Sequence, residues 1–241
     1  MAIETSYLSV LSQIIHRARS EKEQKRIKAL CLAYPDLLVP KAALVQFFSE
    51  DLVNRLPVRE DADKIWQWHG LGGCKEPLFD TSALFGELGV DIDVIDIVKA
   101  RGDERIVDLN ERLPEDLHSS YDLVIDTGTC EHCFNVGQAF MNSCAAVNVD
   151  GYLMHAAPMS KCNHGFWNFC PTVYPDFFED NGFEIVFMKG VVGNLKNGMK
   201  LFDLKPFARS ELPSESVIYV VAKRVSDQEL RWPVQRKYRN A

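Results

Sequence analysis

The sequence predicts an α/β fold with a mostly parallel central sheet of about seven strands. An apolar run over residues 121–125 ends in Asp126-Thr127-Gly128-Thr129, and a second run over residues 152–157 follows Asp150-Gly151. The segment between the two runs is long enough for one helix. Two buried strands that are joined through a helix form a βαβ unit, which implies parallel strands.

The same unit indicates where a site should lie. In an open parallel sheet the ligand lies beyond the carboxyl ends of the strands. Asp126, Glu131, His132 and His155 lie at or near the ends of the two predicted strands, so we expect them to cluster at this edge of the sheet. His155 falls within the second strand, where we expect a buried and hydrogen-bonded histidine.

The composition indicates a globular chain with one large α/β domain or two small ones. Of the 241 residues 46% are hydrophobic, so a sizeable core can be buried. The net charge of −7 does not favour nucleic acid as a partner, because phosphate binding needs a basic face. No apolar run approaches the about 20 residues of a membrane span, and the N-terminus lacks an apolar signal core. Seven cysteines, an odd number, fit reduced thiols in the cytoplasm.

The first part of the chain is predicted to be helical. Apolar residues recur on one face of residues 7–32, which predicts a helix, and a second helix is expected over residues 41–56. These two helices would make residues 1–60 an N-terminal helical region ahead of the sheet. A lid over the site, a surface for a homodimer and plain packing against the sheet remain open as its role.

Residues 61–225 are predicted to form the sheet domain. Strands are expected at residues 65–69, 93–97, 105–109, 121–125, 152–157, 183–189 and 217–223. Helices are expected at residues 81–88 and 174–181, the latter capped by Gly182. The last two strands should form an antiparallel pair, separated by a loop-rich insert over residues 191–216. Residues 226–241 are predicted to be a basic, solvated tail.

Glycines and acids at the predicted strand ends suggest a nucleotide site. Gly70-Leu71-Gly72-Gly73 would let a ligand approach the backbone, although a plain tight turn would use the same residues. Asp96 ends the second predicted strand about twenty residues later, where an acid can bind a ribose or simply lie in solvent. Asp108 ends the third strand, where it can bind an adenine amino group or cap the next turn.

These placements resemble the class I S-adenosylmethionine-dependent methyltransferases. The family's loop after the fourth strand often reads Gly-Thr-Leu-Glu-His, and the chain has Gly128-Thr129-Cys130-Glu131-His132. The fifth strand of the family is similar to residues 151–158 (GYLMHAAP). Residues 163–171 (NHGFWNFCP) resemble a segment of a bacterial subgroup that is linked to glycan and natural-product pathways. Where the first motif of the family has its acid and its third glycine, the chain has Trp68 and Cys74.

The resemblance implies a Rossmann-like methyltransferase fold. It implies transfer of a methyl group from S-adenosylmethionine to a hydroxyl or amine of a small molecule or glycan intermediate. The residues implied as cofactor contacts are Gly70, Gly72, Asp96, Asp108, Thr127 and Glu131. His132 and His164 are the candidate bases, a structural hydrogen bond being the alternative role for His132. The acceptor is expected to contact Asn163, Phe166 and Trp167.

Two other functions are compatible with the sequence. The first is a non-catalytic partner subunit with a methyltransferase-like fold, because the first motif has lost its acid and its third glycine. The second is a zinc-stabilised binding domain, because Cys130 and Cys133 have CxxC spacing, with Cys162 and His164 downstream. A second pair with zinc-ligand spacing is missing, so the sequence predicts no metal site.

Overall fold

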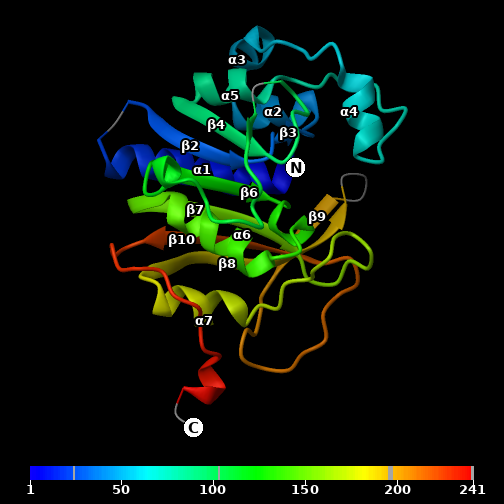
Figure 1. The fold of residues 1–241 in the computed structure, drawn as a ribbon. Coiled ribbons are helices and arrows are strands. Elements are labelled where there is room, and N and C mark those ends of the chain that lie inside the picture. Colours follow the sequence, from blue (N-terminus) through cyan, green and yellow to red (C-terminus); the bar gives the residue numbers. More distant parts are fainter. Residues whose placement is uncertain (24, 103, 195–197, 240–241) are drawn as a thin grey trace.

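The computed structural model describes residues 1–23, 25–102, 104–194 and 198–239 (Figure 1). The strands are β1 (Ala2–Ile3), β2 (Ile27–Leu32), β3 (Asp36–Leu37), β4 (Val90–Asp96), β5 (Arg105–Ile106), β6 (Tyr121–Thr127), β7 (Val147–Pro158), β8 (Phe183–Asn194), β9 (Gly198–Phe202) and β10 (Val217–Arg224). The α-helices are α1 (Thr5–Glu21), α2 (Lys41–Phe47), α3 (Glu50–Arg55), α4 (Ala62–Trp68), α5 (Thr81–Glu87), α6 (Val136–Ala146) and α7 (Val173–Asp180).

The main sheet has eight strands in the order β5-β4-β2-β6-β7-β10-β8-β9. All pairs from β5 to β7 are parallel. The chain order therefore reverses between β2 and β6, which is where a doubly wound sheet opens a crevice for a ligand. β10 is antiparallel to both β7 and β8, and β9 is antiparallel to β8. The mostly parallel, Rossmann-like α/β sheet that the sequence predicts is confirmed.

Helices cover both faces of this sheet (Figure 1). On β6, Leu123 and Ile125 belong to the core that includes buried residues of α1 and α5, whereas Val124 belongs to the core of α6 and α7. This alternation follows from the two-residue period of a strand, and it explains why a strand buried on both faces reads as a continuous apolar run.

The first strand of the sheet is β2, not residues 65–69 as predicted. The predicted helix over residues 7–32 ends at Glu21, and Glu23 has a φ of +53°, which no right-handed helix accommodates. The apolar run that follows is buried in the middle of the sheet. In a short, continuous apolar run next to a helix, the spacing of the apolar residues does not distinguish a strand from more helix. The region predicted as helical, residues 1–60, therefore supplies a central strand.

Residues 65–69 instead belong to α4 and its C-cap. Gly70 follows that cap with a φ of +70°. Its N–H donates to the carbonyl of Gln67 at 3.0 Å, and the N–H of Leu71 donates to the carbonyl of Trp66 at 2.8 Å. Two such bonds with a left-handed glycine form the Schellman motif that ends a helix. Gly70 and Gly72 thus do not follow a strand, and the predicted glycine-rich loop between a strand and a helix was wrong.

The other predicted elements are present, most of them with shifted bounds. The predicted helix over residues 41–56 is divided into α2 and α3 at Ser49, whose side chain accepts a hydrogen bond from the N–H of Leu52. The insert over residues 191–216 contains the end of β8 and all of β9. Among the described residues, no helix has the length and apolar character that crossing a membrane requires.

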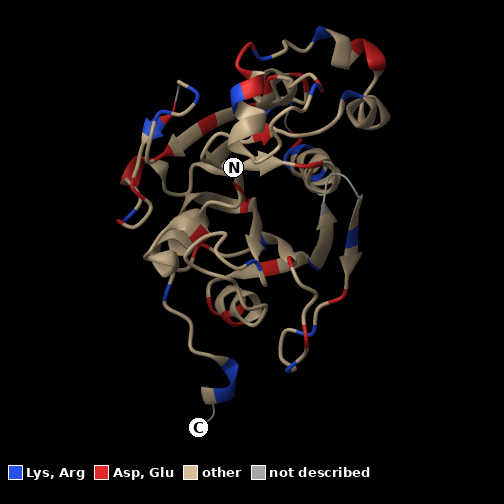
Figure 2. Cartoon of the chain, turned by 90° about the vertical axis from the view of Figure 1, so that its right-hand side faces the viewer, with Lys and Arg blue, Asp and Glu red and all other residues tan. Residues whose placement is uncertain are grey.

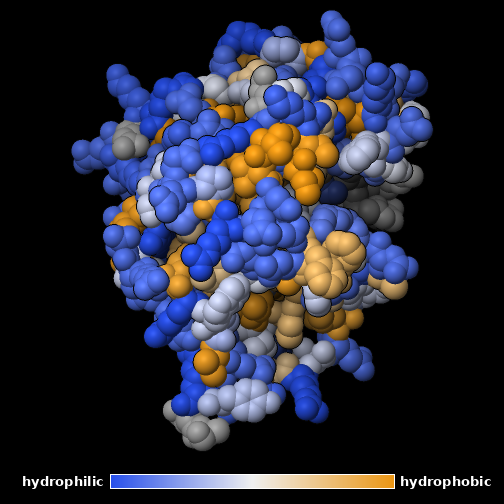
Figure 3. Space-filling model, viewed as in Figure 1, coloured by the Kyte–Doolittle hydropathy of each residue, from blue (hydrophilic) through white to orange (hydrophobic). Residues whose placement is uncertain are grey.

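The basic tail packs against α7 more closely than a solvated tail would. The N–H of Arg231 donates to Asn181, and Arg236 and Arg239 form ion pairs with acids of α7. The tail runs past α7 at the bottom of Figure 1. The face of the molecule seen in Figure 3 is largely hydrophilic, and its largest hydrophobic patch lies in the upper half, with smaller ones below.

Candidate functional site

A cavity of about 680 Å³ opens at the carboxyl edge of the sheet. Its wall includes Thr127 at the end of β6 and Gly128 after it, residues 156–158 at the end of β7, and Tyr7 of α1. Figure 2 looks onto the side of the molecule on which the N-terminus lies and shows acidic and basic residues interspersed, without a continuous basic face. The position beyond the strand ends is the one that the sequence predicts for a ligand.

Asp126 and His155 form a fully buried pair beneath this cavity. His155 Nδ1 lies 2.8 Å from Asp126 Oδ2, and the N–H groups of Gly128 and Thr129 donate to Asp126 Oδ1. Burial alone would raise the pKa of Asp126, but the charge and hydrogen bond of His155 outweigh it and hold this pKa below its usual value. Asp126 therefore fixes the turn after β6, and the prediction that His155 is buried and hydrogen-bonded is confirmed.

Glu131, His132 and His164 come together at the mouth of the cavity. Glu131 is 1% exposed, and its Oε1 atom lies 3.4 Å from His164 Nε2 and 4.0 Å from His132 Nε2. The two imidazole rings are 5.4 Å apart. The N–H groups of Phe166 and Trp167 donate to the carbonyl of Glu131, so the loop after β7 is held against the loop after β6. The structure thus brings both predicted bases to one place.

The predicted acceptor contacts lie outside the cavity wall. Phe166 and Trp167 are exposed and pack with Phe134, with ring centroids 5.8 and 6.2 Å from it. Trp167 Nε1 donates to the carbonyls of Cys133 and Phe134. Asn163 is exposed and has a φ of +58°, which suits the tight turn ahead of His164. These aromatic rings flank the cavity mouth and do not line the cavity itself.

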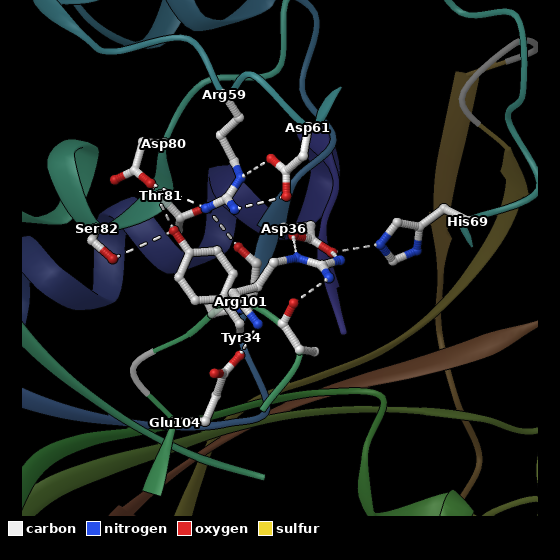
Figure 4. A network of polar contacts seen from close by, with 12 residues as sticks. Tyr34, Asp36, Arg59, Asp61, His69, Asp80, Thr81, Ser82, Arg101 and Glu104 are labelled. Atoms are coloured by element: carbon white, nitrogen blue, oxygen red, sulfur yellow. Dashed lines mark hydrogen bonds and ion pairs between the residues drawn. The ribbon is translucent and has the colours of Figure 1, made fainter. Parts of the chain in front are cut away.

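The crevice between β2 and β6 is filled by side chains for which the sequence predicted no role. Asp36, 2% exposed, accepts hydrogen bonds from Arg101 Nε at 2.9 Å and Nη2 at 2.6 Å, and its Oδ2 atom lies 2.8 Å from His69 Nε2 (Figure 4). The Met1 thioether accepts a hydrogen bond from the N–H of Thr127 at 3.1 Å. A ligand that enters this crevice must displace the Met1 side chain.

The two predicted acids on the other side of the crevice differ in their surroundings. Asp96 lies at the carboxyl end of β4, as predicted, and its Oδ1 atom accepts from the N–H groups of Ile97 and Val98. Asp108 is exposed and accepts from the backbone and side chain of Asn110, so it caps a turn. The cap is one of the two roles that the sequence left open for Asp108, and contact with an adenine amino group stays a prediction.

Asp36 gives the fold a dependence on pH. Burial raises the pKa of Asp36, but hydrogen bonds from His69 and Arg101 outweigh it and hold the pKa below its usual value. A depressed folded-state pKa adds stability above the unfolded value of about 3.9, and this stability is lost as pH falls through the folded-state pKa. We expect Asp36→Asn to lower the free energy of unfolding by about 3 kcal/mol at pH 7, because the Arg101 charge loses its partner. Thermal melting should show this difference shrinking below pH 4; a constant difference would contradict it.

The cysteines behind the zinc alternative do not come together as ligands. All seven cysteines are free. Among the described residues, two groups of side chains have metal-ligand spacing: Asp126 with Cys130 and His155, and Glu131 with His132 and His164. Neither Cys162 nor Cys170 belongs to either group.

Comparisons with known proteins give structural similarity only. No family model and no curated protein matches the chain. A 1,6-didemethyltoxoflavin-N1-methyltransferase of Burkholderia thailandensis, solved with S-adenosylhomocysteine, is 12% identical, with a TM-score of 0.47 over 89% of this chain and 77% of that one. A SAM-dependent methyltransferase of Archaeoglobus fulgidus is 13% identical, with a TM-score of 0.42 over 88% and 93%. The [4+2]-cyclase SpnF is 9% identical, with a TM-score of 0.37 over 88% and 81%.

Proposed function

We propose that the chain binds S-adenosylmethionine at the carboxyl edge of its sheet and transfers the methyl group to a hydroxyl or amine of a small molecule or glycan intermediate. One observation carries this proposal. The cavity lies beyond the strand ends, beside the reversal between β2 and β6, and its wall includes residues of the two segments whose sequences resemble the methyltransferase motifs.

An unpartnered polar atom at this edge fits a polar cofactor. Thr127 Oγ1 is buried and has no hydrogen-bond partner among the described residues, and Thr127 lines the cavity. Buried polar atoms without a partner are costly, and a bound ligand can satisfy them. Asp96, at the end of β4, would hold the ribose. The backbone after β2, where Ala33 has a φ of +67°, takes the place of the glycine-rich loop.

The residues at the cavity mouth suit the acceptor side. The cofactor supplies an activated methyl group, so the protein has to align the acceptor and exclude water. His132 and His164 are each about half exposed, beside the buried Glu131, where an imidazole can take the proton that the acceptor hydroxyl or amine loses. Phe134, Phe166 and Trp167 offer rings on which a sugar or planar acceptor can stack.

A non-catalytic partner subunit remains the second candidate function. The observation in its favour is the crevice between β2 and β6, in which the Asp36–Arg101 pair and Met1 occupy the place where a cofactor would lie. Under this function the fold would be kept for assembly, and S-adenosylmethionine would not bind.

Calorimetric titration with S-adenosylhomocysteine separates the two functions. We expect one binding site per chain and a loss of affinity of about tenfold or more in Asp96→Ala, because a charge-assisted hydrogen bond to the ribose is lost. The matched control is Asp91→Ala, which removes an exposed acid at the other end of β4. Absence of binding to the wild type would overturn methyl transfer and favour the partner subunit.

A further inference from the structure

We infer that Glu131, His132 and His164 bind one divalent transition-metal ion at the mouth of the cavity. A carboxylate oxygen and two imidazole nitrogens of these residues lie within 4.8 Å of one another. Glu131 Oε1 is 3.4 Å from His164 Nε2 and 4.0 Å from His132 Nε2. Two ligands of one tetrahedral ion, each bound at about 2.1 Å, lie about 3.4 Å apart. Small rotations of the two half-exposed imidazoles therefore complete the site.

The state of the Glu131 carboxylate is the second, independent observation. This side chain is 1% exposed, and its Oε2 atom has no hydrogen-bond partner in the described part of the chain. The ion pairs found for it within that part involve only His132 and His164, without any Lys or Arg. A buried carboxylate without a permanent cation is costly, and a metal ion would supply the missing positive charge.

The two loops that hold these ligands are shaped around Glu131. A Cβ atom at Gly165 would lie 2.8 Å from the carbonyl oxygen of Glu131, and one at Gly128 would lie 3.0 Å from its Oε1 atom. Glycine at both positions lets the loop after β7 close on the loop after β6, which brings His164 to the carboxylate although it lies far along the chain. This close approach accounts for the convergence of the three ligands.

The ligand set indicates the class of ion and of substrate group. Two imidazoles and a carboxylate suit Zn²⁺, Fe²⁺ and similar ions, and three protein ligands leave coordination positions open. All three residues line the cavity, so the open positions face it. A hydroxyl or carboxylate oxygen of a small molecule could then bind the ion, which would lower the pKa of a bound hydroxyl. This role rests on the proposed function, whereas binding of the ion does not. With the ion bound, both imidazoles are ligands rather than bases.

The other group with metal-ligand spacing is less suited to an ion. Asp126, Cys130 and His155 are fully buried, and both carboxylate oxygens of Asp126 already accept hydrogen bonds. Burial also raises the pKa of Cys130 well above its usual value, which disfavours the thiolate that a metal needs.

The test is titration of chelator-treated protein with Zn²⁺ and, separately, Co²⁺. We expect one ion per chain, with visible absorption bands from bound Co²⁺. Glu131→Gln and His164→Ala should each weaken binding at least about tenfold, since even residues behind the ligands contribute that much. His16→Ala, which removes an exposed histidine of α1, should leave binding unchanged.

Circular dichroism of each metal-free variant shows whether it is folded. If Glu131→Gln is not folded, the titration of His132→Ala, which changes an exposed side chain, decides the test. Absence of binding to the wild type would overturn the inference. Unchanged affinity for the ion in the folded variants would also overturn it. So would a result in which Cys130→Ser no longer binds the ion while His164→Ala binds it like the wild type. Because no cofactor is present in this titration, its result is independent of whether S-adenosylmethionine binds.

Discussion

Replacing Asp126 by Ala is expected to destabilise the fold by about 4 kcal/mol, because a buried charge network loses its anion. The substitution leaves His155 Nδ1 and the N–H groups of Gly128 and Thr129 without their acceptors in a fully buried setting. Each buried donor without an acceptor costs about 1–3 kcal/mol. Urea denaturation followed by circular dichroism measures the free energy of unfolding. Asp126→Asn should lower this free energy less, because its amide oxygen still accepts hydrogen bonds.

Asp91→Ala provides the control for this prediction. Asp91 is exposed and pairs with Arg26 at the surface, where an ion pair contributes little. If Asp126→Ala lowered the free energy of unfolding no more than Asp91→Ala does, the Asp126 network would not stabilise the turn after β6.

His164→Ala is expected to lower the turnover of methyl transfer about a hundredfold or more, whether the imidazole accepts the proton or holds an ion. Its affinity for S-adenosylhomocysteine should stay close to that of the wild type, because His164 lies at the mouth of the cavity and not at β4. Turnover is measured with an acceptor found by screening hydroxyl- and amine-bearing small molecules with methyl-labelled cofactor.

His132→Ala and the remote His16→Ala complete this series. The former should also lower turnover, and the latter should not. If His164→Ala and His132→Ala both kept full turnover, neither imidazole would act on the acceptor, and methyl transfer would depend on proximity alone.

The unit from β6 to β7 was predictable because two buried apolar runs lie one helix apart in the sequence, and the first ends in Asp126-Thr127-Gly128. The second strand begins earlier than predicted, since Asp150-Gly151 lies within β7. β2 was not predictable, because its apolar run follows α1 after only a few charged residues and carries no strand period of its own. Because residues 65–69 were predicted as the first strand, Gly70 and Gly72 were predicted to form a ligand-binding loop. Local hydrogen bonds show instead that Gly70 ends α4.

The candidate site was predictable to the extent that topology places strand ends together. Glu131 and His132 were expected at one edge for that reason, and the structure places them there together with His164. The pair of Asp36 and Arg101 has no local signal, because its partners are 65 residues apart. If residues 27–32 are taken as a strand, Asp36 is an acid shortly after the carboxyl end of that strand, where a ligand contact is expected.

The most direct measurement is a crystal structure of the chain with S-adenosylhomocysteine. We expect the nucleoside at the carboxyl edge, with its ribose hydroxyls hydrogen-bonded to Asp96 and its sulfur directed towards Thr127 and the cavity. The Met1 side chain should have moved out of the crevice between β2 and β6. Two results would contradict this expectation. One is a complex in which the nucleoside binds elsewhere. The other is a crystal grown at a saturating concentration in which no nucleoside is bound and Met1 and the Asp36–Arg101 pair are unchanged.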